Sequence, residues 1–101
     1  MKIKKKDFFG KKVQHNGFIL NSTDAYDSAR NIEDIFLTKA KWKLFKGPQP
    51  MHYMDIREAY KKYVPDMEKY HPGVIDLITQ PEIIRQIGFN VDSDGMVYYP
   101  K

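Results

Sequence analysis

The 101-residue chain contains no cysteine, which excludes disulfides and thiolate zinc sites and gives no sign of an oxidising compartment. It has no apolar run near the roughly 20 residues that a membrane span needs. Its charged opening, MKIKKKDFFGKK, is not followed by the apolar stretch of a secretory signal. These absences predict a protein without a membrane partner and with an intracellular, cytoplasmic location.

Recognisable catalytic motifs are also missing. The three histidines, His15, His52 and His71, stand alone, without a HExxH pattern or a second histidine four residues on. The six glycines are scattered and form no phosphate-binding loop. Residues 92–95 (DSDG) begin like a calcium loop, but no acidic residue follows at the closing position, so a hairpin turn is favoured. We therefore expect a non-catalytic protein that needs no cofactor or metal.

What is present is typical of one folded domain. The chain is 42% hydrophobic and 14% aromatic, well above the composition of disordered chains. We expect a single domain over residues 1–101. Within it, residues 1–7 are a candidate for a flexible basic tail that docks at its end, and residues 47–50 (GPQP) for an ordered proline-rich connector.

The pattern of residues predicts an α+β fold of about three helices with a hairpin at each end. Lys11 to Leu20 reads as a hairpin around Asn16-Gly17, because this pair tolerates the positive φ of a tight turn. A helix is expected from Ala25 to Lys46, capped by Ser22, Thr23 or Asp24. Its end stays open, since residues 41–44 alternate at the strand period.

The second half contains the best helical pattern, from Asp55 to Val64, after which Pro65 either ends the helix or starts a short turn. Residues 74–78 are compatible with a buried strand or a helical turn. Residues 79–82 (TQPE) resemble a capping box, in which the side chains of Thr79 and Glu82 would bind amides at a helix start.

The last helix should bury Ile83, Ile84 and Ile87 and stop at Gly88. A hairpin should then pair residues 89–91 with residues 97–99.

The order of elements from Asp55 to Pro100 resembles that of a winged helix, whose helix before the hairpin reads a DNA major groove. Two features oppose DNA reading here. That helix offers only Glu82, Arg85 and Gln86 as polar side chains, and the acidic hairpin tip at residues 92–94 would repel phosphates.

Positive charge gathers in the first half. The net charge is +4, but eleven Lys and Arg face five Asp and Glu through Lys46, against six and eight afterwards. Lysines interleaved with aromatic residues are typical of single-stranded nucleic-acid binding. The candidate contact residues form two clusters: Lys2, Lys4, Lys5, Lys6, Lys11 and Lys12, and then Lys39, Lys41, Trp42, Lys43 and Lys46. Core packing is the other reading of Trp42, Phe45 and Phe8.

The leading hypothesis is a nucleic-acid-binding accessory or regulatory protein that contacts phosphates of DNA or RNA through these lysines. The alternative is a protein-binding inhibitor or adaptor that docks on an acidic face of a larger partner. Tyrosine is enriched at interface hot spots, and the tyrosines that favour this alternative are Tyr53, Tyr60, Tyr63, Tyr70, Tyr98 and Tyr99. A structural subunit of an assembly is a third option.

Overall fold

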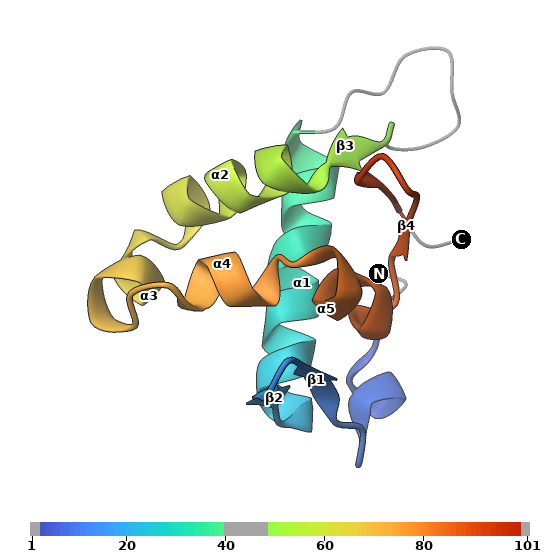
Figure 1. The fold of residues 1–101 in the computed structure, drawn as a ribbon, viewed down its shortest axis with the longest axis vertical. Coiled ribbons are helices and arrows are strands. Elements are labelled where there is room, and N and C mark those ends of the chain that lie inside the picture. Colours follow the sequence, from blue (N-terminus) through green and yellow to red (C-terminus); the bar gives the residue numbers. More distant parts are fainter. Residues whose placement is uncertain (1–2, 40–48, 100–101) are drawn as a thin grey trace.

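A computed structural model describes residues 3–39 and 49–99. Within these ranges the chain forms five α-helices and two small antiparallel sheets, which confirms the α+β fold class (Figure 1). No helix in the described ranges is both long and apolar enough to span a membrane. Of the expected connector at residues 47–50, only 49 and 50 are among the described residues.

The chain begins with a packed turn and a hairpin. The 3-10 helix η1 (Lys5–Phe8) is followed by β1 (Val13–His15) and β2 (Phe18–Leu20), with Val13 opposite Leu20. Asn16 and Gly17 both have positive φ, of 50° and 83°, so the tight turn forms where expected. Residues 3–7 differ from the expected flexible tail, because Ile3 is buried in the core.

Helix α1 (Ser22–Lys39) is the central element, and the other helices lie around it in Figure 1. Its apolar face, which includes Ile32 and Phe36, is fully buried. Asn21 caps the helix, since its Oδ1 accepts a hydrogen bond of 2.8 Å from the Asp24 amide. The prediction of a cap within residues 22–24 was therefore wrong by one position. The expected extension over residues 40–46 lies outside the described residues.

Three helices follow the break: α2 (Tyr53–Tyr63), α3 (Pro65–Tyr70) and α4 (Val74–Ile78). Helix α2 buries Ile56, Ala59 and Tyr60 as its periodicity predicts, whereas Tyr63 is 52% exposed. Pro65 opens α3, because proline suits the first turn of a helix. Residues 74–78, left open between strand and helix, are helical.

The capping box predicted at Thr79 and Glu82 is absent. The Thr79 hydroxyl instead donates a hydrogen bond of 2.6 Å to the Ile75 carbonyl and accepts one of 2.9 Å from Nε of Arg57. Glu82 pairs with Arg85. Because α4 ends at Ile78, the Thr79 hydroxyl binds a carbonyl one turn back, as Thr often does at a helix end. The prediction treated Thr79 only as the start of the next helix, whereas it directly follows the end of α4.

Helix α5 (Pro81–Ile87) buries Ile83, Ile84 and Ile87 and ends at Gly88, whose φ is 126°, all as predicted. The hairpin of β4 (Asn90–Val91) and β5 (Met96–Tyr98) is also confirmed. A two-residue strand, β3 (Met51–His52), pairs with β5 and completes a sheet of order β3-β5-β4. The sequence analysis did not predict β3.

Strand β1 of the N-terminal hairpin contacts α5 at Gln86. The side-chain amide of Gln86 accepts a hydrogen bond from the Gln14 amide at 3.0 Å and donates one to the Gln14 carbonyl. The guanidinium of Arg85 donates to the Val91 carbonyl at 3.2 Å and pairs with Glu82, and both side chains are exposed. Each of the three polar side chains of α5 thus has a partner within the protein.

Candidate nucleic-acid interface

The tight turn of η1 sends two neighbouring phenylalanines in opposite directions. The Asp7 carboxylate accepts a hydrogen bond of 3.4 Å from the Lys4 amide, and the Asp7 amide donates one of 3.0 Å to the Lys4 carbonyl. Phe8 is 2% exposed, and its ring centroid lies 5.9 Å from that of Tyr26 on α1. Phe9, just past the turn, is 92% exposed. Phe8 therefore anchors the segment while Phe9 lies in solvent.

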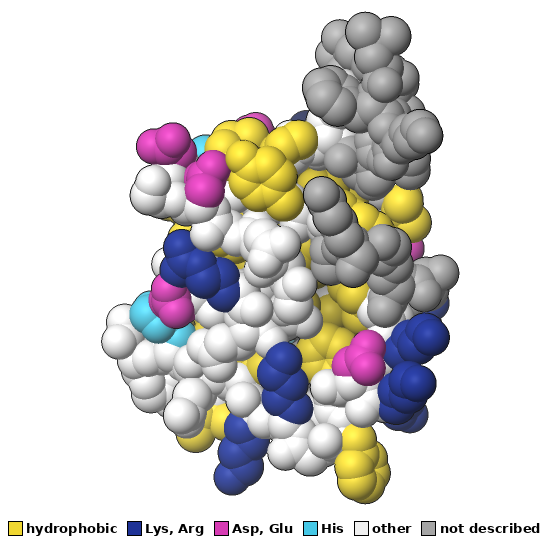
Figure 2. Space-filling view, turned by 90° about the vertical axis from the view of Figure 1, so that its right-hand side faces the viewer, with side chains coloured by type: hydrophobic (Ala, Val, Ile, Leu, Met, Phe, Trp, Pro, Cys, Tyr) yellow, Lys and Arg dark blue, Asp and Glu magenta, His cyan; other side chains and the backbone are white. Residues whose placement is uncertain are grey.

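Five described lysines flank this pair in the sequence. We call Lys4, Lys5, Lys6, Lys11 and Lys12, together with Phe9, the N-terminal basic surface. Four of these lysines are exposed and Lys11 is half-buried. Among residues 3–12 the five lysines face only one acidic side chain, Asp7. Figure 2 shows one face of the molecule, on which dark blue side chains lie at several separate places, most of them in the lower part of the view.

Lys11 differs from the other lysines because its ammonium is already occupied. It donates a hydrogen bond to the Gln86 carbonyl at the end of α5, and it lies 5.4 Å from the ring centroid of Phe8. A cation at the C-terminus of a helix is also favoured by the helix dipole. Lys11 therefore holds η1 against α5, and its predicted contact with phosphate stays a prediction.

Arg30 extends the basic surface and was missed by the sequence analysis. It is exposed on α1, with its guanidinium carbon 5.8 Å from the ring centroid of Tyr26. The same Tyr26 ring contacts Phe8. The i, i+4 spacing of Tyr26 and Arg30 on a predicted helix was the available signal, but only the docking of η1 places Arg30 near the lysines.

The second predicted cluster is described only at its first residue. Lys39 ends α1, thirteen residues after Tyr26, so its backbone lies about 20 Å along the helix from the docking point of η1. Lys2, Lys41, Trp42, Lys43 and Lys46 lie outside the described residues. Their predicted contact with nucleic acid stays a prediction.

The hairpin tip has the opposite charge. The pKa of the Asp92 carboxyl is lowered, chiefly by the hydrogen bond that it accepts from the Met96 amide. The pKa of Tyr98 is raised, because its hydroxyl donates to the Asp92 carboxylate at 3.2 Å. The tip therefore keeps its negative charge into acid solution, and phosphates are expected to avoid it.

The histidines lie in turns and caps. His52 caps α2, since its Nδ1 accepts a hydrogen bond of 3.1 Å from the Met54 amide, and its Nε2 lies 3.1 Å from the Asp94 carbonyl. His15 ends β1, where its Nε2 lies 3.2 Å from the side-chain amide of Asn16, and His71 is exposed after α3. Within the described ranges, no three metal-binding side chains come together.

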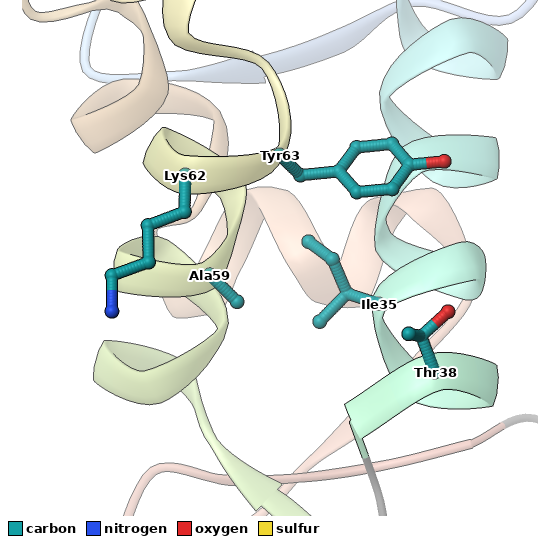
Figure 3. Close-up of a pocket in the computed structure, with 5 residues that line it drawn as sticks. All are labelled: Ile35, Thr38, Ala59, Lys62 and Tyr63. Carbon is teal, nitrogen blue, oxygen red and sulfur yellow. The ribbon is translucent and has the colours of Figure 1, made fainter.

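A small hollow of about 210 Å³ lies between α1 and α2 (Figure 3). Ile35 and Ala59 form its apolar part, and the Lys62 side chain points away from it. The Tyr63 ring reaches across toward α1, where its hydroxyl lies 3.3 Å from Oδ2 of Asp34. The lining contains no pair of side chains arranged as a nucleophile and its base.

One carboxylate is fully buried. Oε2 of Glu33 accepts a hydrogen bond of 2.7 Å from the Tyr99 hydroxyl, while Oε1 has no hydrogen-bond partner among the described residues. The pair ties α1 to the residue after β5, beside the stacked rings of Phe36 and Phe89. The Glu33–Tyr99 pair is part of the core packing. It does not line the hollow between α1 and α2.

No protein-family model, curated protein or solved structure matches the chain.

Proposed function

We propose that the protein binds single-stranded nucleic acid, without catalysis, through the N-terminal basic surface. The observation that carries the proposal is Phe9, which is 92% exposed and is flanked in the sequence by exposed lysines. A large ring in water is unfavourable by about 2 kcal/mol relative to a buried one, and stacking on a base would recover about 1–3 kcal/mol. Lysines on either side would hold the phosphates of the same strand.

Two features favour a single strand over a duplex. Stacking on Phe9 requires an unpaired base, because paired bases already stack on each other. In addition, the polar side chains of α5 already have partners within the protein, and the β4–β5 tip is acidic. The elements that a winged helix uses for groove reading are thus occupied or repulsive, and the lysine surface offers contacts to phosphate rather than to base edges.

The lysines at Lys39, Lys41, Lys43 and Lys46, with Trp42, would lengthen the binding path if one strand reached both clusters. A role as an accessory or regulatory protein follows from non-catalytic binding of this kind, and an intracellular location would bring it to DNA or RNA.

The test is a titration of fluorescein-labelled oligodeoxythymidine, oligoadenosine RNA and a DNA duplex, each at about 50 and 200 mM salt. The decisive variant changes Lys4, Lys5, Lys6 and Lys12 to Glu. A matched control changes Lys62 and Lys69 to Glu, which are exposed lysines elsewhere. We expect the first variant to bind the single strands at least about tenfold more weakly and the control to bind within about twofold of the parent. Equal binding by both variants contradicts the proposal.

A second candidate function is docking on an acidic protein face through the same lysines. The exposure of Tyr63 and Tyr70, at 52% and 68%, favours it, because exposed tyrosines often anchor interfaces. The two candidates separate on nuclease treatment of a complex isolated from the native host. A complex with one protein that survives nuclease supports the adaptor function, and loss of all bound material supports nucleic-acid binding.

A further inference from the structure

A groove of about 360 Å³ opens on the other side of α1, between β2, α3 and α4. Its apolar lining includes Leu20, Met67, Val74 and Ile78. Ile19, at its edge on β2, is 59% exposed although it is a β-branched apolar residue on a strand. The groove therefore offers apolar surface that an inserted side chain would remove from water.

One wall of the groove is acidic. Asp24 and Asp27 line it from α1 and are both exposed. No hydrogen bond or ion pair engages either carboxylate in the described part of the chain. A second hollow, of about 450 Å³, adjoins the groove, shares Asp27 and Met67 with it, and adds Asp34.

The positive groups near this wall are few. His71 lines the groove from the α3 side, and Arg30 borders the second hollow, where its guanidinium lies over the Tyr26 ring. Asp24, Asp27 and Asp34 lie on one face of α1, because side chains three, four or seven residues apart lie on the same face of a helix. The row of carboxylates is thus a continuous feature beside the apolar groove.

The acidic wall is held in place from within. The Asn31 side chain, between Asp27 and Asp34 in the row, donates a hydrogen bond of 3.0 Å to the hydroxyl of buried Tyr60. Ser28, one residue after Asp27, is buried in the groove wall. A preformed wall lowers the entropy cost of binding.

The groove and the N-terminal basic surface lie on opposite flanks of α1. At 100° per residue, Tyr26, which holds η1, and Ser28, which lines the groove, point about 200° apart around the helix axis. Figure 1 agrees, with the short blue coil of η1 on one side of α1 and with α3 and α4 on the other. The apolar part of the groove therefore lies away from η1, whereas Arg30, which contacts the Tyr26 ring, lies between the two surfaces.

We propose that this groove binds a cationic peptide segment of a partner protein, which inserts an apolar side chain between β2 and α4 and pairs its Lys or Arg residues with Asp24 and Asp27. The apolar lining favours the apolar side chain of the peptide, and the two carboxylates favour its Lys or Arg residues. Nucleic acid is disfavoured, since the same carboxylates repel phosphate. A second copy of the chain could offer Phe9 and its lysines; such a head-to-tail contact would build rings or open-ended chains, which sedimentation would detect.

The test selects ligands on the intact protein. Phage-displayed random peptides of about 12 residues are panned against the immobilised full chain, and binders are titrated while backbone amide shifts are followed by NMR. We expect the selected peptides to carry several Lys or Arg residues around an apolar one. They should shift the amides of residues 18–20, 24–28 and 67–78. Acidic or neutral peptides, shifts elsewhere, or no binder tighter than about 1 mM would each overturn the proposal.

A charge-neutralising variant gives the matched control. Asp24→Asn with Asp27→Asn should weaken the selected peptides at least about tenfold, whereas Asp94→Asn, an exposed aspartate at the hairpin tip, should leave binding within about twofold. The spectra of both variants report whether they fold. Unchanged affinity in the double variant overturns the charge assignment. Sedimentation that detects self-association lost in the double variant also overturns the proposal, in favour of a second copy of the chain. Oligonucleotide binding by the same variants shows separately whether the N-terminal basic surface works.

Discussion

Gln86 binds the backbone of Gln14 through both ends of its side-chain amide, which joins helix α5 to strand β1 across 72 residues of sequence. This pair of hydrogen bonds holds the N-terminal hairpin against one side of α5. It also fixes β1, which directly follows the exposed Lys12. The contact therefore helps to position the N-terminal basic surface on the rest of the fold.

Gln86→Glu is the sharpest change at this contact. A carboxylate can still accept from the Gln14 amide but places negative charge against the Gln14 carbonyl, so the donor is lost. We expect a loss of about 1–3 kcal/mol in the free energy of unfolding, measured by urea denaturation. Gln86→Ala, which removes both bonds without adding charge, should cost less. If the two variants unfold alike, the added charge at Gln14 costs no more than the acceptor bond that it keeps, and the expected order is wrong.

Phe9→Ala and Phe8→Ala should have opposite effects. Loss of the exposed Phe9 ring should leave stability nearly unchanged and weaken single-strand binding by about 1–3 kcal/mol. Loss of the buried Phe8 ring should cost about 3–5 kcal/mol of stability through the cavity it leaves. Thermal unfolding and oligonucleotide titration measure the two quantities. If Phe9→Ala binds the single strand with the affinity of the parent, Phe9 does not stack on a base.

Asp92 should make stability depend on pH in a defined direction. Its folded-state pKa lies below the ordinary value of 3.8, chiefly because of the Met96 amide. The stabilisation is therefore fully present above the ordinary value and is lost as the pH falls through the folded-state pKa. Asp92→Asn should unfold at lower urea than the parent at about pH 7, and the difference should shrink toward about pH 2. Asp94→Asn is the control, since its carboxylate accepts no hydrogen bond in the described part of the chain. If the difference in stability between Asp92→Asn and the parent stayed constant from about pH 7 to about pH 2, Asp92 would not be the source of the pH dependence.

Gly95→Ala should disrupt the three-stranded sheet. Gly95 has φ of +85°, and an added Cβ would lie 2.8 Å from Nε2 of His52 and 2.9 Å from Cδ1 of Tyr53. Gly73 has the same φ but an added Cβ there meets nothing within 4 Å. Gly73→Ala therefore isolates the backbone strain of about 1–3 kcal/mol, and the excess loss in Gly95→Ala measures the contact with β3 and α2. If the two variants lose equal stability, the side chains of His52 and Tyr53 move away from the added Cβ at no cost in free energy.

Local sequence signals predicted the elements whose cause is local. The Asn16-Gly17 turn needs only two residues that tolerate positive φ, and the stop at Gly88 needs only one. Helix α2 follows from its periodicity. Strand β3 could not be found in this way, because two residues carry no alternation and its pairing with β5 is made across more than 40 residues. The prediction of a capping box was wrong because the Thr79 hydroxyl binds the Ile75 carbonyl of α4. This partner is available only because residues 74–78 are helical, which the sequence left open.

The candidate site was predictable in charge but not in geometry. The lysines are visible in the sequence, yet nothing local says that Phe8 points inward and Phe9 outward, because that depends on where η1 meets Tyr26. Arg30 enters the surface for the same reason. The groove draws on β2, α1, α3 and α4, so its acidic wall and apolar lining come together only in the fold.

The central claim is that exposed N-terminal lysines bind the phosphates of a single strand, and the salt dependence of binding tests it most directly. For single strands the logarithm of the binding constant falls with the logarithm of salt with a slope of about −0.7 per phosphate contact. The four exposed lysines of the N-terminal basic surface thus predict a slope of about −3 or steeper. Lys5→Gln with Lys6→Gln should reduce its magnitude by about 1.4. A slope near zero, or one unchanged in the double variant, would contradict the account.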